Sequence, residues 1–464
     1  MKNKVYLVGA GPGSPDLITV RGREVLRHAD VVIYDYLVDK RLLDEAKDGA
    51  ELVCCDTLGN KRHSDGFLIH QDRIDALVAK KAKENKRVVR LKNGDPSIFS
   101  RAGQELNSLV KNRIEFEIVP GVGAANAAAA LSGIPLTDRK LASSCVFVTG
   151  HEDPAKPGSS LDWASLGRAG TIVLYMAVEN FGKITDALIA AGRPEATPVA
   201  IIENVSLPTQ RLLTGTLADI AKTARKKKVK APAIVIIGDV VKLEKKFNWL
   251  MRMRRVLFTG ISPERFFERG VIFHLPLIKI VPLNDCRALE GALKNIAAYD
   301  WLVFSSRYGV LHFFQALNKI GYDARALAKA KVAAIGNSTK ARLLDFGILA
   351  DVVPKDESAR GLINEFKRVD IKGKRIFMPR SDLSDKGLKE GLESQGAIVD
   401  AVVAYRNIIP QGLPELDIKS FDEVIFTSPS TVRNFKKRYG ALPRGIKVKC
   451  IGDVTQREFR RCKM

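Results

Sequence analysis

The chain has 464 residues, of which 46% are hydrophobic and 27% charged, and its formal net charge is +23 at pH 7. This length exceeds what one ordinary hydrophobic core accommodates and predicts two or three domains. No apolar run reaches the roughly 18 residues that a membrane span needs, and the N-terminus has no signal-peptide pattern, so the sequence argues against a membrane-embedded or secreted protein.

The expected elements follow one another as apolar, β-rich runs separated by helical stretches, which is the pattern of an α/β fold. Helices are predicted around 21–27, 71–83 and 102–109. The predicted strands of the first half are 5–8, 31–34, 51–54, 88–91, 116–119, 146–149, 171–176, 198–202 and 233–237.

The first strand runs into a loop with glycines at positions 9, 11 and 13. A dinucleotide fingerprint needs Gly-x-Gly-x-x-Gly, and here Gly13 comes one residue early. Pro12 and Pro15 also remove two backbone N–H groups that a pyrophosphate would need. The loop therefore argues against a nicotinamide or flavin site and for a different ligand.

Three further loops rich in small residues follow strand ends, at 93–96, 120–125 and 175–177. Ligands of α/β proteins gather at the carboxyl ends of strands, and small residues let a ligand approach the backbone. Asp95 could bind ribose hydroxyls or an ammonium group, and Met176 offers an apolar wall. Together the four loops predict a site for a compact nucleoside that bears an amino acid.

A charge-rich stretch at 242–255 ends this pattern and places a domain boundary near residue 250. Beyond it, the segment 300–306 followed by 334–339 resembles the later pair 422–428 followed by 450–455. Two similar α/β units that face each other are the economical interpretation, and the cleft between them is the default ligand site.

The remaining composition leaves the partner open. The densest basic run, Arg225 to Lys228 with Lys230, is expected in a loop before a strand. Nucleic acid would explain the charge, a small polyanionic substrate would use it for steering, and a general solubility adaptation is the third possibility. The six cysteines include no Cys-x-x-Cys and fit reduced thiols of a cytoplasmic protein. The six histidines are scattered, so no metal site is expected.

Within roughly residues 1–245 the first half contains, in order, GAGPGSPDLIT, ADVVIYDYLV, VVRLKNGDPSIFSR, IVPGVGAANAAAALSGIPLTDR, VFVTGH, TIVLYMA and PVAIIEN. With these segments it resembles the tetrapyrrole methylases, and within them the uroporphyrinogen-III C-methyltransferases. The resemblance implies transfer of methyl groups from S-adenosylmethionine to two carbons of uroporphyrinogen III, giving precorrin-2 and S-adenosylhomocysteine at the entry to sirohaem and cobalamin. It also implies two α/β subdomains with the cofactor between them, usually in a homodimer.

The family's site positions transfer to this sequence residue by residue. Asp35 and Arg101 match positions for substrate handling: Arg101 could form a forked pair with a substrate carboxylate, and Asp35 could assist proton loss from the methylated ring. The implied cofactor contacts are Pro12, Asn93, Gly94, Asp95, Ile98, Gly123, Ala124, Met176 and Val205.

This sequence departs from the family's pattern at several of these loops. Gly123-Ala124 replaces a usual Thr-Ser pair, Asp138 replaces a histidine, and Tyr36 replaces a more polar residue. Fewer hydroxyl and carboxylate contacts could weaken binding of the cofactor or the substrate. The segment around Arg101 is usually richer in glycine and glutamate, and here it carries Ser97, Ser100, Ala102 and Gln104.

The second half contains the segments VFSSRYGV, AAIGNSTKARLLDFG, GKRIFMPRSDLSDKGLKEGLESQGAIVDAVVAYR, VIFTSPSTV and CIGDVT. With them it resembles uroporphyrinogen-III synthase, which cyclises hydroxymethylbilane without a metal or a cofactor. Tyr405 matches the family's site tyrosine and is a candidate acid for the leaving hydroxyl group. Two departures put an intact synthase cleft in doubt: a short first helix around 263–269, and a last helix cut short at 462–464.

Hydroxyl residues at the strand ends of this half would either bind the acidic side chains of the substrate or cap helices. They are Ser305, Ser306, Ser338, Thr339, Ser428 and Thr455.

The sequence thus predicts a methylase domain at 1–245, a linker at 246–254 and a synthase-like domain at 255–464. The implied partners are tetrapyrrole substrates, with neither nucleic acid nor membrane. One alternative is a different, cobalamin-pathway methyltransferase with an inactive synthase-like domain. The other is a non-enzymatic, nucleic-acid-binding role based on the positive charge.

Overall fold

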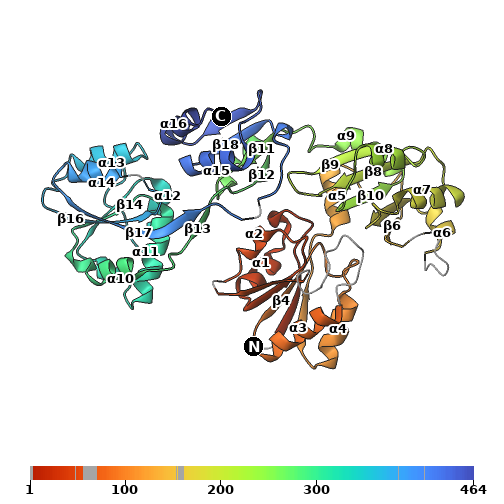
Figure 1. Ribbon diagram of the computed structural model, residues 1–464, viewed down its shortest axis with the longest axis horizontal. Helices are drawn as coiled ribbons and strands as arrows, with labels where there is room; N and C mark the ends of the chain where they lie inside the picture. Colours follow the sequence, from red (N-terminus) through yellow and green to blue (C-terminus); the bar gives the residue numbers. More distant parts are fainter. Residues whose placement is uncertain are drawn as a thin grey trace. The chain divides into compact units, whose positions relative to one another are not determined.

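The computed structural model describes residues 4–47, 49–55, 71–152, 154, 161–384, 386–411 and 413–464, without the side chains of residues 264 and 265. The chain divides into two compact units, one mostly within residues 1–256 and the other mostly within 257–464 (Figure 1). The short segments 267–273 and 414–422 group with the first unit. The α/β class expected from the sequence is confirmed in both units.

The first sheet of the first unit is parallel throughout, in the order β3-β2-β4-β1-β5. Its strands are β1 (Lys4–Gly9), β2 (Val31–Tyr34), β3 (Glu51–Cys54), β4 (Val88–Lys92) and β5 (Glu115–Val119). The helices of this part are α1 (Val20–Arg27), α2 (Lys40–Leu43), α3 (Gln71–Lys83) and α4 (Ala102–Lys111). All five strands predicted here and the three predicted helices are confirmed.

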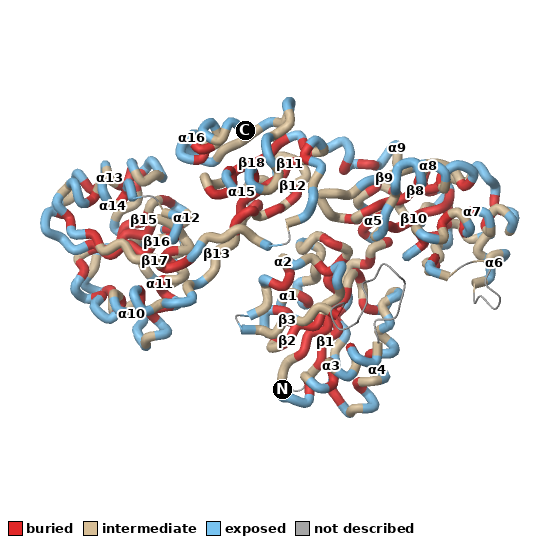
Figure 2. Tube along the Cα trace, in the orientation of Figure 1, coloured by how far each residue is buried: buried red, intermediate tan, exposed pale blue. Residues whose placement is uncertain are grey.

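This sheet forms the middle of three layers. Val5 and Leu7 of β1 pack with apolar residues of α3 and α4, whereas Val8 packs with residues of α1 and α2. The division follows from the alternation of side chains along a strand. The central strands are consequently buried on both faces, as Figure 2 shows for β1 and β2.

The second sheet of the first unit has the order β6-β7-β10-β8-β9. Strands β6 and β7 are parallel, and the other neighbours are antiparallel. Its strands are β6 (Cys145–Thr149), β7 (Thr171–Tyr175), β8 (Pro198–Glu203), β9 (Arg211–Thr216) and β10 (Ala233–Ile237). Its helices are α5 (Ala124–Ser132), α6 (Trp163–Gly167), α7 (Phe181–Ala190), α8 (Ile220–Lys226) and α9 (Glu244–Phe247).

Three details of this sheet differ from the sequence predictions. Strand β9 was not predicted, because it lies at the edge of the sheet and none of its side chains is fully buried. Met176 lies just beyond β7 rather than inside it. Arg225 and Lys226 form the last turn of α8 rather than a loop, where their charge complements the carbonyl end of the helix dipole.

Two more sheets follow, with the orders β12-β11-β18-β19 and β13-β17-β16-β14-β15. Their strands are β11 (Arg255–Phe258), β12 (Val271–His274), β13 (Lys279–Val281), β14 (Trp301–Phe304), β15 (Lys331–Ala334), β16 (Arg375–Ser381), β17 (Ile398–Ile408), β18 (Glu423–Phe426) and β19 (Lys447–Cys450). The helices are α10 (Arg287–Lys294), α11 (Arg307–Lys319), α12 (Asn337–Leu344), α13 (Ala359–Phe366), α14 (Gly387–Glu393), α15 (Pro429–Tyr439) and α16 (Asp453–Arg461).

The internal repeat predicted from the sequence is confirmed: β14-α11-β15-α12 in one sheet corresponds to β18-α15-β19-α16 in the other. The segment Glu264–Arg269, where a short first helix was expected, forms a 3-10 helix. All six cysteines are free thiols. Within the described ranges, no helix is both long and apolar enough to cross a membrane.

Candidate functional site

Three strand ends of the first sheet meet at glycines. The backbones of Gly11 and Gly94 form an isolated antiparallel bridge, in which the Gly94 amide donates to the Gly11 carbonyl at 2.8 Å. A Cβ atom on Gly121 would lie 2.3 Å from the Gly94 carbonyl oxygen and 2.7 Å from the Cα of Gly9. Since backbone atoms shift only at a considerable cost in free energy, only glycine fits without strain, and the loops after β1, β4 and β5 form one packed surface.

The carboxylate of Asp95 fastens this surface. Its Oδ2 accepts the amide of Gly121 at 2.8 Å, and its Oδ1 accepts the amide of Ser97 at 2.7 Å. Burial raises the pKa of Asp95, but the hydrogen bonds from Ser97 and Gly121 outweigh it, and the net pKa is lowered. The sequence predicted that this carboxylate contacts a ligand's ribose or ammonium group. In the structure its hydrogen bonds join the loops after β4 and β5.

Tyr175, the last residue of β7, connects the second sheet to α5. Its phenol oxygen accepts a hydrogen bond from the Ala125 amide at 3.1 Å. The N-cap of α5 is Gly123, which has no side chain to cap the helix. Tyr175 therefore provides a hydroxyl at the helix N-terminus, where the usual Thr-Ser pair is replaced by Gly123-Ala124.

The loop after β8 completes the assembly. The amide of Ser14 donates to the Ser206 hydroxyl at 2.9 Å, which joins the first loop to the loop that contains Val205. The structure thus brings together, by direct hydrogen bonds, all four loops predicted from the sequence and the Val205 loop. The Val205 side chain itself is buried in the apolar core.

Backbone strain is concentrated at the same place. Among the described residues, nine non-glycine residues have positive φ. Four of them follow the ends of α3, α4, α8 and α16, where a left-handed residue commonly ends a helix. The other five all lie in the loops after β4, β7 and β8: they are Phe99, Arg101, Met176, Asn204 and Ser206. Such strain clusters at functional sites.

The same loops present groups that are suited to a ligand. Within the described ranges, Asn93 Oδ1 is buried and has no hydrogen-bond partner, and a native protein seldom leaves such an atom unpaired. Met176 is 53% exposed and Phe99 is 43% exposed, although both are large and apolar. Pro12 and Ile98, which precedes Phe99, are half-buried. The surface therefore combines an unpaired acceptor with apolar walls.

The two residues expected to handle the substrate differ in their surroundings. Asp35 follows β2; its Oδ1 contacts Arg90 Nη2 at 2.5 Å and its Oδ2 accepts the Asn93 amide at 3.2 Å. Burial raises the pKa of Asp35, and the charges of Arg90 and Lys92 lower it by more. Arg101 is exposed at the start of α4, and in the described part of the chain its guanidinium has no ion-pair partner.

Sequence reasoning missed a cluster of buried charges next to Asp35. Arg90 and Lys92 of β4 are 3% and 1% exposed, and both contact Glu105 of α4, which is 4% exposed. The available signal was their spacing, since positions i and i+2 of a strand face the same side. Two cations on one face of a strand predicted to be buried require buried anions.

In the second unit, Tyr405 lies on β17 and is buried. Its phenol forms a hydrogen bond with Ser306 Oγ at 2.8 Å, and the ring of His312 stacks on it with a centroid distance of 5.5 Å. Burial raises the pKa of Tyr405, and the Ser306 hydrogen bond opposes that effect without reversing it. The phenol therefore keeps its proton at neutral pH.

The hydroxyl residues of this unit have separate roles. Ser306 caps α11 and Ser428 caps α15, so the capping interpretation is confirmed for both. At α12 the N-cap is Gly336, and the Glu357 carboxylate accepts from the amide of Asn337 at 3.1 Å. Ser338 and Thr339 lie inside α12, and Thr455 is buried inside α16.

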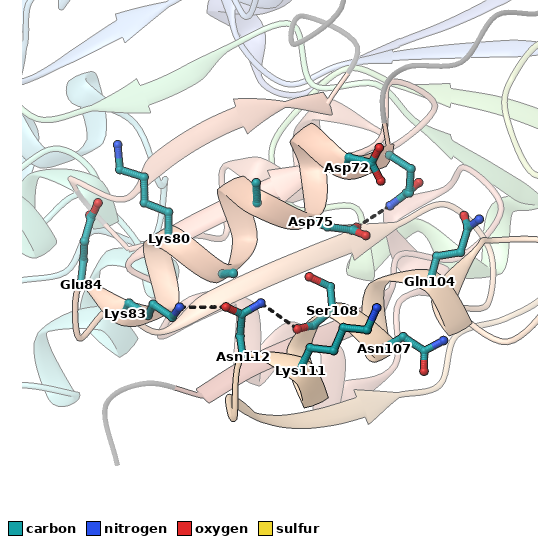
Figure 3. A pocket seen from close by; sticks show the side chains of 13 residues that line it. Asp72, Asp75, Lys80, Lys83, Glu84, Gln104, Asn107, Ser108, Lys111 and Asn112 are labelled. Atoms are coloured by element: carbon teal, nitrogen blue, oxygen red, sulfur yellow. Dashed lines mark hydrogen bonds between the residues drawn. The ribbon is translucent and has the colours of Figure 1, made fainter.

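A large open groove lies elsewhere in the first unit, between α3 and α4 (Figure 3). Its volume is about 910 Å³, and polar side chains line it. Several of these side chains form hydrogen bonds with one another; for example, Lys83 Nζ donates to Asn112 Oδ1 at 2.8 Å. None of the predicted site residues lines it. Within the described ranges, no group of three or more His, Cys, Asp or Glu residues is arranged to hold a metal ion.

Comparisons with known proteins match both halves of the chain. Residues 4–221 match the family described as tetrapyrrole (corrin/porphyrin) methylases, and residues 268–464 match uroporphyrinogen-III synthase HemD. The porphyrin biosynthesis protein HemD of Ruminiclostridium josui is 33% identical over 97% of this chain and 92% of its own length.

Two further relatives carry methyltransferase names. The uroporphyrinogen-III C-methyltransferase of Bacillus subtilis is 35% identical over 78% of this chain and 75% of its own length. The S-adenosyl-L-methionine-dependent uroporphyrinogen III methyltransferase of Methanosarcina barkeri is 46% identical over 52% of this chain and 92% of its own length.

Proposed function

Because the chain belongs to the tetrapyrrole methylases that carry a fused uroporphyrinogen-III synthase, we propose that it is a bifunctional enzyme that makes and then methylates uroporphyrinogen III. The second domain closes hydroxymethylbilane into uroporphyrinogen III with loss of water. The first domain, with S-adenosylmethionine as methyl donor, methylates two ring carbons and gives precorrin-2. The observation that carries the proposal is the unbroken set of hydrogen bonds that joins the five loops into one surface.

The surface suits S-adenosylmethionine. The buried, unpartnered Asn93 Oδ1 is an acceptor for an amino group, and Gly94 leaves open space, since a Cβ there would meet only the Ala124 amide nitrogen at 3.8 Å. When bound, the sulfonium supplies an electrophilic methyl group. The residues proposed to hold it are Pro12, Asn93, Gly94, Asp95, Ile98, Gly123, Ala124, Met176 and Val205.

We assign Asp95 and Val205 indirect parts in this site. Asp95 acts by fixing the loops after β4 and β5, because its oxygens accept their amides. Val205 acts through the backbone of its loop, because its side chain belongs to the core.

For the substrate, we propose that Asp35 accepts the proton that the methylated ring loses. Its carboxylate is about one-third exposed and its lowered pKa keeps it ionised. Arg101 pairs with a carboxylate of the macrocycle, which its exposure allows and its forked geometry favours. Positioning of the carbon in line with the methyl group then provides much of the rate enhancement.

For the synthase, we propose that Tyr405 donates the proton that lets the hydroxyl group leave as water. The hydrogen bond to Ser306 fixes the phenol, and the protonated state of Tyr405 at neutral pH supports this role.

The domain bounds, the oligomeric state and the location are proposed from family membership. We propose domain bounds of 1–245 and 255–464 with a linker at 246–254, a homodimer formed through the methylase domain, and a cytoplasmic location without nucleic-acid or membrane partners. Precorrin-2 would then lie at the entry to sirohaem and cobalamin. Light scattering after gel filtration tests the dimer, because a monomeric mass contradicts it.

The decisive experiment supplies the full chain with hydroxymethylbilane and S-adenosylmethionine and follows products by mass spectrometry. We expect precorrin-2 and two equivalents of S-adenosylhomocysteine. Product that forms only when uroporphyrinogen III is supplied would leave the methylase and remove the synthase. The absence of product with either substrate would refute both activities. Family membership favours this function over a later cobalamin-pathway methyltransferase.

A further inference from the structure

The buried charges beside Asp35 form one connected ionic network. Arg90 lies at its centre: Nη2 contacts Asp35 Oδ1 at 2.5 Å, and Nε contacts Glu105 Oε1 at 3.1 Å. Lys92 Nζ contacts the same Glu105 oxygen at 2.7 Å. Glu105 Oε2 is buried and has no hydrogen-bond partner among the residues that the structure describes. Two cations therefore share one oxygen of Glu105, and only Arg90 reaches on to Asp35.

Other groups around the network are accounted for. Gln71 of α3 donates to Glu105 Oε1 at 3.3 Å and to Asp75 Oδ1 at 2.8 Å. Cys55, which follows β3, is buried, and burial raises the pKa of its thiol to about 12, so the thiol stays neutral. With Asp75 outside the buried set, the network holds two positive and two negative charges only while Asp35 is ionised.

Stability alone does not explain such a network, because well-packed apolar residues would generally serve a buried core as well or better. Its position does suggest a purpose. One end of the network is the candidate proton acceptor, and the second oxygen of Asp35 is held by the Asn93 amide at the edge of the site. Both oxygens are thus fixed, while about a third of the side chain is exposed.

We propose that Arg90 is a positioning residue which, clamped by Glu105, holds Asp35 in its proton-accepting form and aims it at the methylated ring. Lys92 balances the second charge of the network. This inference rests on the proposed methyltransferase function and on the proposed role of Asp35, and it adds the residues through which that role is set.

Removal of Arg90, the central cation, tests whether its charge keeps Asp35 ionised. In Arg90→Met, Asp35 loses its direct partner while Glu105 keeps Lys92, so Asp35 becomes easier to protonate. In the pH profile of kcat/KM for methyl transfer, we expect the acid limb, where activity falls as Asp35 is protonated, to move upward by about one to three pH units. This is the usual effect of one nearby charge on a carboxyl pKa. The profile is measured with uroporphyrinogen III and S-adenosylmethionine.

A double variant separates charge from structural damage. In Arg90→Met/Glu105→Gln, the network retains only Lys92 and Asp35, so the cation is free to balance Asp35 and the limb moves back toward the wild-type position. Structural damage would instead accumulate over two substitutions. A limb that stays displaced in the double variant, or that never moves in the single one, overturns the proposal.

A conservative variant tests whether Arg90 orients Asp35 toward the methylated ring. Arg90→Lys keeps the charge but loses the forked contact, so we expect an unchanged acid limb, an unchanged KM for S-adenosylmethionine and a lower kcat. An unchanged kcat would overturn the aiming role even if Arg90→Met fails to fold. Lys81→Met, which removes a cation paired with Glu51 at 2.8 Å outside the network, should retain the wild-type profile. A wild-type chain without methyl transfer would refute the proposed function rather than this inference.

Discussion

The phenol oxygen of Tyr175 accepts a hydrogen bond at 3.1 Å from the amide of Ala125, a residue fifty positions earlier in the chain. The contact joins the end of a strand in the second sheet to the first turn of α5. Because Gly123 cannot cap this helix, the tyrosine hydroxyl satisfies an amide that would otherwise lack a protein partner.

The first prediction concerns this contact. Tyr175→Phe removes the acceptor and should lower the free energy of unfolding by about 1 kcal/mol, the usual value of a helix cap. It should also weaken S-adenosylmethionine binding, because the start of α5 lies in the proposed cofactor surface. Thermal unfolding and titration calorimetry measure the two effects. The matched variant Tyr322→Phe, at a 43% exposed tyrosine of the second unit, should change neither.

The second prediction concerns the glycine contact. Gly121→Ala places a Cβ 2.3 Å from the Gly94 carbonyl oxygen, so the backbone must shift and the first unit should be destabilised by about 3 kcal/mol or fail to fold. Gly103→Ala has no atom within 4 Å of its Cβ and should stabilise α4 by about 0.5 to 1 kcal/mol. Equal stabilities of the two variants in urea would contradict the packing described.

The third prediction concerns the strain at Arg101, which has a φ of 59°. Arg101→Gly should raise the free energy of unfolding by about 1 kcal/mol, since glycine adopts this conformation freely. The same variant should lower kcat/KM for uroporphyrinogen III about ten- to hundredfold through loss of a charge-assisted hydrogen bond. Arg113→Gly, at a left-handed residue with a φ of 54° after α4, should gain stability and keep its activity.

The Arg101 result has a clear contrary outcome. Unchanged turnover in Arg101→Ala, with the protein folded and S-adenosylmethionine still bound, would remove this residue from the proposed mechanism.

The fourth prediction concerns pH and Asp95. Because the native pKa of Asp95 is lowered, its ionised form stabilises the fold. That contribution is fully present above the ordinary aspartate pKa of about 3.9 and is lost as the pH falls through the lower native pKa. Asp95→Asn should therefore cost about 1 to 2 kcal/mol at pH 7 and progressively less in acid. Unfolding midpoints across pH measure the difference, and Asp16→Asn in the first loop is the control.

The fifth prediction concerns Tyr405. Because burial raises the pKa of its phenol, the proton stays in place to at least about pH 10. The rate of hydroxymethylbilane cyclisation should show no loss from this group below that pH. Tyr405→Phe should reduce the rate about a hundredfold or more if the phenol is the acid, and should leave methylation of supplied uroporphyrinogen III unchanged. A full cyclisation rate in Tyr405→Phe would exclude the acid role.

The sequence predicted much of the fold because its strands are strongly apolar and its loops are rich in glycine. Strand β9 was not predicted, because it is an edge strand whose side chains are half-exposed and it therefore lacks a strongly apolar run. The loops of the site could be anticipated for a similar reason: the carboxyl ends of parallel strands share one edge, so 9–16, 93–96 and 120–125 had to lie near one another.

Contacts between residues far apart in the sequence could not be predicted in this way. Nothing in the sequence pairs Tyr175 with Ala125, or chooses Glu105 among the acidic residues of the first unit as the partner of Arg90 and Lys92. These pairings depend on how helices pack on the sheets. The positions of Arg90 and Lys92 indicated that buried anions must exist, but not which ones.

The close contact of Gly9, Gly94 and Gly121 has a consequence for ligand exchange. Because the backbones of these three loops touch, we expect the loops to move together or not at all. We therefore expect any adjustment that admits the methyl donor, or releases S-adenosylhomocysteine and the methylated product, to occur in the loops after β7 and β8, which hold the exposed Met176 and the strained Ser206. Variation among related enzymes in which tetrapyrrole they accept should accordingly concentrate in the loops after β7 and β8, and engineering of new acceptors should begin there.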